Sequence, residues 1–148
     1  MSATSPPGSL LIYTPPCVTW SKVDGSMHGM MKPVVLVVED EPLLRLFATD
    51  MIEEAGFEVL QAPNASAALM TLEERLDVRV VFTDVNMPGG IDGIMLAICI
   101  RRRWPTIQII ITSGRPWPVE AVVPADVVFF AKPYRQDRVL DTVRKMAA

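Results

Sequence analysis

A run of five aliphatic residues, Val34 to Val38, is the feature that most restricts how this chain folds. The run shows no alternation of polar and apolar residues, and all but Leu36 are β-branched. The acidic cluster Glu39 to Glu41 ends it. A strand of this kind needs apolar cover on both faces, as a central strand of a parallel sheet has. The run therefore predicts a parallel sheet with helices on both faces.

The order of strand followed by helix then repeats along the chain. After Pro42, apolar residues recur with the period of a helix, and Gly56 follows where a C-terminal cap belongs. This first stripe consists of Leu44, Phe47, Ala48, Met51, Ile52 and Ala55. Asn64 is the predicted N-cap of a second helix. Its apolar stripe consists of Ala65, Ala68, Leu69, Leu72 and Leu76.

Further strands and helices follow from the same patterns. Strands are predicted at 57–60, 79–83, 107–112 and 127–130, and helices at 93–103 and 136–146. Cys99 is predicted to pack as a small core residue, and Val139, Leu140 and Val143 to face inward. Five strands alternating with helices indicate an α/β fold with a parallel sheet and right-handed crossovers.

Length and composition limit the domain organisation. The 148 residues leave room for one domain, and a content of 50% hydrophobic and 21% charged residues excludes wholesale disorder. Residues 1–32 are rich in proline and glycine without a sustained period, so we predict a flexible tail before a folded domain at 33–148. Pro116, Pro118 and Pro124 predict at most a short helix between 114 and 126.

Charge and cysteine content exclude several classes of function. A formal net charge of −3 gives no reason to expect direct nucleic-acid binding, and Arg101 to Arg103 are interpreted as a solvated helix end. Cys17 and Cys99 are too few for a disulfide framework or a zinc site, which favours a reducing compartment. The apolar stretch 10–13 is too short for a signal peptide or a membrane span, so we expect a cytoplasmic protein without membrane contact.

Polar residues gather where the predicted strands end. They are Glu39, Asp40, Asp84, Thr112, Ser113 and Lys132. Because ligands of open parallel sheets bind at the carboxyl ends of the strands, these side chains are expected to converge. Three carboxylates together repel one another, and a hard divalent cation with oxygen ligands, such as Mg²⁺, would relieve this. A carboxylate nucleophile that receives a phosphoryl group needs such a metal, together with a cation and a hydroxyl donor.

Four segments at these strand ends resemble the receiver domain of two-component response regulators, of the single-domain type. They are 37–42 (VVEDEP), 83–88 (TDVNMP), 110–114 (IITSG) and 130–134 (FAKPY). The four occur in the family's order, and the resemblance covers residues 33–147. It implies a flavodoxin-like, doubly wound sheet of five parallel strands in the order 2-1-3-4-5.

The resemblance also implies roles for individual residues. Asp84 would accept a phosphoryl group from a histidine kinase or phosphotransfer protein. Mg²⁺ would be held by Glu39, Asp40, Asp84 and the backbone carbonyl of Asn86. Thr112 would be the switch hydroxyl and Lys132 the paired cation, with Phe129 at the aromatic switch position. The Lys132–Pro133 peptide bond would be cis.

The sequence departs from the family pattern in two places. The spacing of 20 residues between Thr112 and Lys132 (132 − 112) is short for the family, so at most a short helix is expected in place of the family's fourth helix. The glycine expected eight residues after the phosphorylated aspartate is Gly93, nine residues after Asp84, so Gly89-Gly90 looks like a one-residue insertion that lengthens a loop.

The preferred function is a stand-alone receiver whose phosphorylation switches protein binding in a phosphorelay. We do not expect an enzyme acting on external substrates; the downstream target and homodimer formation stay open. One alternative is a haloacid-dehalogenase-like phosphatase, but Asn86 stands where that family needs an aspartate as general acid. The other is a receiver-like module that binds constitutively, which the full set of acidic, hydroxyl and lysine residues disfavours.

Overall fold

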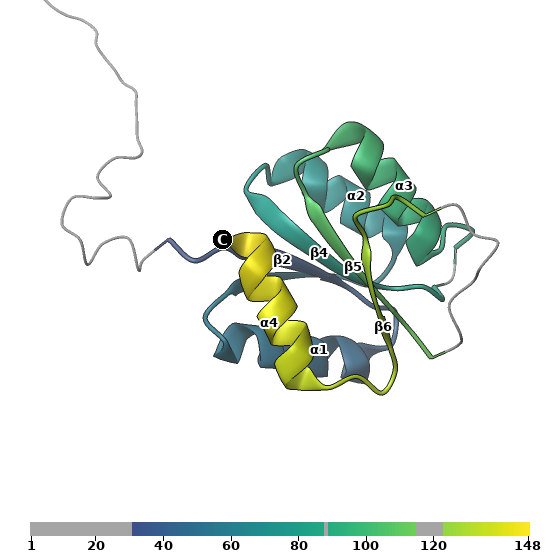
Figure 1. Cartoon of the computed structure of the whole chain (residues 1–148). Coiled ribbons are helices and arrows are strands. Elements are labelled where there is room, and N and C mark those ends of the chain that lie inside the picture. Colours follow the sequence, from purple (N-terminus) through teal and green to yellow (C-terminus); the bar gives the residue numbers. More distant parts are fainter. Residues whose placement is uncertain (1–30, 88, 115–122) are drawn as a thin grey trace, which may run out of the picture. The chain divides into compact units, whose positions relative to one another are not determined.

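The computed structural model describes residues 31–87, 89–114 and 123–148. Within them lies a sheet of five parallel strands in the order β3-β2-β4-β5-β6 (Figure 1). The strands are β2 (Val34–Val38), β3 (Glu58–Ala62), β4 (Val78–Asp84), β5 (Gln108–Ser113) and β6 (Val128–Ala131). This is the predicted order 2-1-3-4-5, so the expected flavodoxin-like fold is confirmed.

Strand β2 takes the central place that its aliphatic run predicts. All five of its residues are buried, between β3 on one side and β4 on the other. Its side chains alternate between two hydrophobic clusters: Val35 and Val37 belong to one, and Leu36 and Val38 to the other. Both faces of the strand are therefore apolar and covered, which explains the absence of polar alternation.

In the described part of the chain, helices cover both faces of the sheet, as Figure 1 shows. The helices are α1 (Pro42–Glu54), α2 (Ala65–Glu74), α3 (Gly93–Arg103) and α4 (Gln136–Ala147). Ala68 and Leu72 of α2 share a cluster with Leu96 and Ile100 of α3. Ile52 of α1 packs in the opposite cluster, together with Val139 and Val143 of α4. The predicted inward positions Val139 and Val143 are fully buried, and Leu140 is partly buried.

The predicted caps are confirmed. The Asn64 side chain accepts a hydrogen bond of 2.8 Å from the backbone N–H of Ala67 and so caps α2. Gly56 adopts a φ of +103° just after α1, which only glycine tolerates well. Leu76 was wrongly assigned to the stripe of α2: the helix ends at Glu74, and Leu76 is 82% exposed in the following turn. Cys99 is only partly buried.

The arginine run ends α3, as predicted, but its first residue is more than a solvated charge. Arg101 Nη1 donates hydrogen bonds of 2.7 Å to the carbonyl oxygens of Pro105 and Ile107. Its Nη2 lies 3.0 Å from the carboxylate of Asp126. Arg101 therefore joins the end of α3 to the segments before β5 and β6.

Two predictions fall mainly on residues outside the described ranges: the tail at 1–32 and the short helix between 114 and 126. Pro33–Ala148 forms one compact unit. None of the helices in the described part of the chain is long and apolar enough to span a membrane.

Candidate functional site

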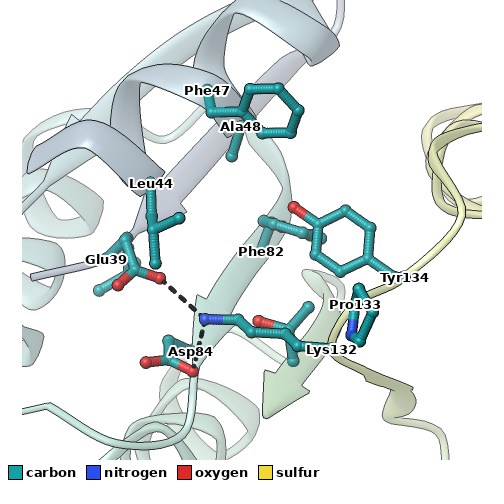
Figure 2. Close-up of a pocket in the computed structure, with 11 residues that line it drawn as sticks. Glu39, Leu44, Phe47, Ala48, Phe82, Asp84, Lys132, Pro133 and Tyr134 are labelled. Carbon is teal, nitrogen blue, oxygen red and sulfur yellow. Dashed lines mark hydrogen bonds and ion pairs between the residues drawn. The ribbon is translucent and has the colours of Figure 1, made fainter. Parts of the chain in front are cut away.

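The predicted site residues meet at the carboxyl ends of the strands. Glu39 follows β2, Asp84 ends β4, and Thr112 lies beside Asp84 in the parallel pairing of β4 with β5. Lys132 follows β6 directly, and its Nζ reaches back over the sheet edge. It lies 3.2 Å from Asp84 Oδ1 and 3.4 Å from Glu39 Oε1 (Figure 2).

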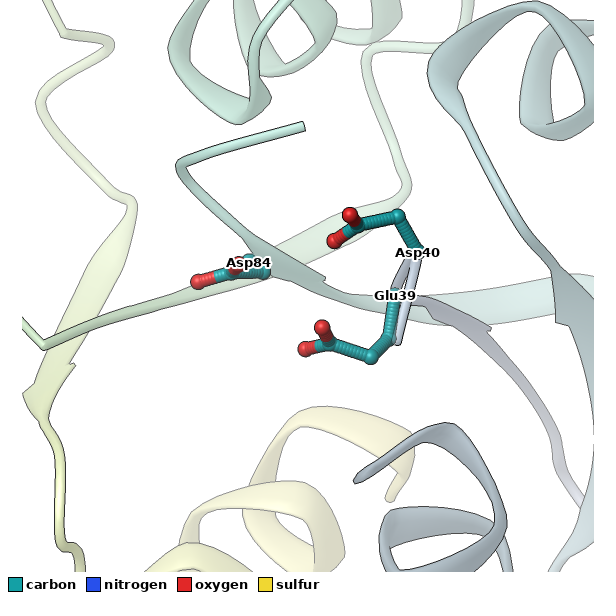
Figure 3. A group of neighbouring side chains, drawn as sticks. All are labelled: Glu39, Asp40 and Asp84. Carbon is teal, nitrogen blue, oxygen red and sulfur yellow. The ribbon is translucent and has the colours of Figure 1, made fainter. Parts of the chain in front are cut away.

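Three carboxylates form a compact cluster at this edge. One oxygen from each of Glu39, Asp40 and Asp84 lies within 4.8 Å of the others (Figure 3). Glu39 and Asp84 are buried, with 7% and 8% of their surface exposed, whereas Asp40 is exposed. A cation that approaches from solvent therefore meets Asp40 first and the two buried carboxylates behind it.

Backbone hydrogen bonds fix the other side of the site. The N–H of Val85 donates to the carbonyl of Thr112 at 2.9 Å, and the N–H of Lys132 donates to the carbonyl of Ser113 at 2.8 Å. The Thr112 hydroxyl is buried and reaches the carbonyl of Thr83 at 3.5 Å. The Lys132–Pro133 bond is cis, as predicted.

The electrostatic state of the cluster follows from burial. Burial raises the pKa of Glu39 above its ordinary value; the nearby Lys132 ammonium opposes this rise, and the Asp84 carboxylate adds to it. Burial also raises the pKa of the Tyr134 phenol, and the negative charge of Glu39 contributes. Negative charge is thus crowded at this edge, and one ammonium only partly offsets it.

The donor set fits a magnesium ion. Its atoms are carboxylate oxygens only, which hard divalent cations prefer, and the exposed Asp40 leaves room for the waters that Mg²⁺ retains. A bound cation would stabilise the ionised form of all three carboxylates. Asn86 is exposed and lies two residues beyond β4; its predicted carbonyl ligand stays a prediction.

A cleft of about 370 Å³ opens beside Asp84. Its polar end contains Glu39, Asp84, Thr112 and Lys132, and its walls are largely apolar (Figure 2). The apolar residues are Val38, Leu44, Phe47, Ala48, Phe82, Pro133 and Tyr134. The ring of Tyr134 stands edge-on to Phe82, with centroids 5.9 Å apart.

Two residues of this cleft correct the predicted core stripe of α1. Leu44 is 47% exposed and Phe47 is 53% exposed, whereas Ala48 and Ile52 farther along the stripe are buried. The stripe has the predicted phase, but its first half lines the cleft rather than the core. Tyr134 also lines the cleft, a position that the sequence segment 130–134 does not predict.

Gly93 lets α3 begin close to the backbone at the end of β4. Its N–H donates to the carbonyl of Val85 at 2.8 Å, and a Cβ at this position would overlap the backbone carbonyl oxygen of Asp84. Gly89 and Gly90 take φ values of +96° and +84° in the loop before it. Two glycines with positive φ therefore precede α3, which begins against the backbone of Asp84; the one-residue insertion stays a prediction.

Comparison with known proteins agrees with this geometry. A family model described as "Response regulator receiver domain" matches residues 35–144. The C4-dicarboxylate transport transcriptional regulatory protein DctD of Rhizobium meliloti is 31% identical over 116 residues, which cover 76% of this chain and 25% of DctD. The chemotaxis protein CheY of Thermotoga maritima is 31% identical over 119 residues, which cover 76% of this chain and 96% of CheY.

A similar solved structure is the response regulator protein TrrA of Thermotoga maritima, in complex with Mg²⁺-BeF. It is 29% identical with a TM-score of 0.68, and the match covers 78% of this chain and 99% of TrrA. The chain spans about a quarter of the length of several curated relatives that it matches, DctD among them. The prediction that the receiver acts without an effector domain therefore stays a prediction.

Proposed function

The chain belongs to the response regulator receiver domain family, and from this premise we propose that Asp84 accepts a phosphoryl group in a magnesium-dependent reaction. The observation that carries the proposal is the position of the buried Asp84 carboxylate, between Lys132 and the acidic pair Glu39 and Asp40. Receiver domains are signalling modules that interact with histidine kinases or phosphotransfer proteins. We infer such a donor here, with a phosphohistidine side chain as the reacting group.

In the proposed reaction a carboxylate oxygen of Asp84 forms a bond to phosphorus while the phosphorus–nitrogen bond of the phosphohistidine breaks. The electron pair of that bond leaves with the imidazole nitrogen, which takes a proton from solvent. Lys132 would stay beside the new acyl phosphate, which carries nearly two negative charges. Glu39, Asp40 and Asp84, with the carbonyl of Asn86, would hold Mg²⁺, which neutralises charge on the phosphoryl oxygens.

The shape of the site supports a protein donor that presents an apolar surface. The cleft that ends at Asp84 has apolar walls, and α1 exposes Leu44 and Phe47 along it, at 47% and 53%. Leu43 and Leu46 of the same helix are also exposed, at 75% and 51%. A monomer rarely exposes such a group without a partner. A helix carrying the phosphohistidine would cover these side chains while its imidazole enters the cleft.

The proposed output is a changed protein-binding surface. Thr112 lies next to Asp84 in the β4–β5 pairing, which supports a role for its hydroxyl in following a phosphoryl group on that carboxylate. Phe129 on β6 is half-buried and packs against the cluster shared by α2 and α3. A shift of Thr112 would change the packing of Phe129, and because phenylalanine has no hydroxyl, the signal would be read through packing alone.

Acetyl phosphate labelling tests the proposal. Incubation of the full chain with acetyl phosphate and Mg²⁺ should add the mass of one phosphoryl group, and EDTA should prevent the addition. Asp84→Asn should abolish it, whereas Asp141→Asn, which removes an exposed carboxylate on α4, should leave it unchanged. Labelling of Asp84→Asn at the wild-type level would overturn the assignment.

The labelling result and a second assay with p-nitrophenyl phosphate separate the alternatives. Steady release of p-nitrophenol from p-nitrophenyl phosphate would favour the haloacid-dehalogenase-like phosphatase. A wild-type chain that is folded and binds Mg²⁺ but is never labelled would favour the constitutive binding module.

A further inference from the structure

The peptide unit that joins Glu39 to Asp40 is held by a side chain from α1. It lies at the point where β2 ends, and the N–H of Glu39 still bonds to the carbonyl of Ala62 on β3, at 3.1 Å. The carbonyl of Glu39 lies in the turn before α1, which begins at Pro42. It accepts a hydrogen bond of 2.8 Å from Arg45 Nη1. This carbonyl belongs to the peptide bond between two neighbouring acidic residues, so its orientation fixes ψ of Glu39 and φ of Asp40, the backbone angles from which the two side chains project.

Arg45 is itself fixed from two directions. Its backbone N–H donates to the carbonyl of Glu41 at 2.9 Å in the first turn of α1. Its Nε lies 3.3 Å from Oε1 of Gln61, a residue of β3. The neighbouring residues Leu44 and Leu46 are exposed, whereas Arg45 is half-buried. The guanidinium therefore bridges the helix, the neighbouring strand and the turn that carries Glu39 and Asp40.

Arg45 contacts this site in a different way from Lys132. Lys132 contacts carboxylate oxygens of Glu39 and Asp84 directly and offsets their charge. Arg45 contacts a backbone carbonyl of the turn, with a planar donor group that can serve two acceptors at once. Its contribution is orientation, whereas that of Lys132 is charge.

We propose that Arg45 is a positioning residue for the divalent cation site, acting by holding the Glu39–Asp40 peptide in the orientation that directs both carboxylates toward the ion. The inference rests on the proposed magnesium-dependent function. Mg²⁺ requires near-ideal octahedral geometry, so its affinity depends on ligands held in place. Groups that orient metal ligands typically contribute 10–100-fold to metal affinity.

Two physical effects of removing Arg45 have opposite signs, which makes the inference testable. If the guanidinium acted only through its charge, its loss would remove a cation that repels Mg²⁺, and Mg²⁺ would bind more tightly. If it holds the turn, its loss frees the peptide between Glu39 and Asp40, and Mg²⁺ binds more weakly. Arg45→Lys keeps the charge but not the planar fork, so a pure charge effect predicts no change for this variant.

The experiment is calorimetric titration of MgCl₂ into the full chain at fixed ionic strength and neutral pH. Arg45→Met, which keeps an unbranched apolar stem, should bind Mg²⁺ about 10-fold more weakly than the wild type. Arg45→Lys should also bind more weakly, by a smaller factor. Arg75→Met is the matched control, because Arg75 pairs with Glu58 and Asp77 outside the strand-end site, and it should bind as the wild type does.

Circular dichroism and urea unfolding of each variant separate a local effect from a loss of fold. If Arg45→Met does not fold, Gln61→Leu serves as a second variant. It removes the acceptor of the hydrogen bond from Arg45 Nε and should weaken Mg²⁺ binding several-fold.

Equal or tighter binding by folded Arg45→Met, or wild-type affinity in Arg45→Lys, would overturn the positioning role while leaving the proposed function intact. Absence of Mg²⁺ binding by the wild type would overturn both.

Discussion

Replacing Gly93 by alanine tests how closely α3 must approach the end of β4. The added methyl group would overlap the carbonyl oxygen of Asp84 and would lie 2.9 Å from its carbonyl carbon and 3.0 Å from Val85 Cα. All three atoms belong to the backbone, so no rotation of a side chain relieves the contact. Either α3 moves away from the sheet or the end of β4 moves, and both changes disturb the carboxylate at Asp84.

The size of the effect is set by two opposing contributions. Forcing an extra methyl group into a packed site typically destabilises a protein by about 1–3 kcal/mol. Alanine in place of glycine at the start of a helix also stabilises the folded protein, by up to about 1 kcal/mol. We therefore expect a net loss of about 1–2 kcal/mol in the free energy of unfolding. At a urea dependence of about 2 kcal/mol/M, the midpoint falls by roughly 0.5–1 M.

The measurement is equilibrium unfolding in urea, accompanied by acetyl phosphate labelling of Asp84. Gly114→Ala is the control for stability, since a Cβ there would meet nothing within 4 Å, and its midpoint should stay close to that of the wild type. Gly93→Ala should also be labelled more slowly, because the strand end that carries Asp84 is displaced. A Gly93→Ala protein as stable as the wild type and labelled at the same rate would refute the close approach.

Two further predictions concern the metal and the N-terminal segment. Mg²⁺ at ten times its dissociation constant should raise the free energy of unfolding by about 1.4 kcal/mol relative to EDTA at equal ionic strength. This increase should be smaller in Asp40→Asn. A wild-type protein whose stability does not change with Mg²⁺ would contradict a metal site at the acidic cluster. A shortened chain that starts at Met31 should accept a phosphoryl group from acetyl phosphate as the full chain does, because the proposed site begins at Glu39; failure to fold or to be labelled would show that residues 1–30 take part in the domain.

The parallel sheet and the convergence of the site could be predicted from local patterns, whereas the order of the strands was implied only by the resemblance to the receiver family. Val34 to Val38 predicted a central strand, and the structure buries all five residues between β3 and β4. Once the sheet is parallel, Glu39, Asp84 and Lys132 must lie at one edge, since each follows or ends a strand. The distances within the cluster depend on side-chain conformations, which the sequence pattern does not report.

The sequence pattern mispredicted the burial of α1, because one periodic apolar stripe of this helix faces both the core and a cleft. Leu44, Phe47, Ala48 and Ile52 recur with one helical period, yet Leu44 and Phe47 are about half exposed along a cleft, whereas Ile52 and Ala48, which also lines the cleft, are buried. A period gives the direction in which a side chain points but not what lies opposite. The residues at the start of α1 line this cleft together with Pro133 and Tyr134, which follow β6.

The role of Arg45 could not be predicted for a related reason. Its partners are the backbone carbonyl of Glu39 and the side chain of Gln61, which lies on a neighbouring strand sixteen residues away. Both features depend on how α1 is placed against the end of the sheet, so the site is set by helix packing as much as by the residues that follow the strands.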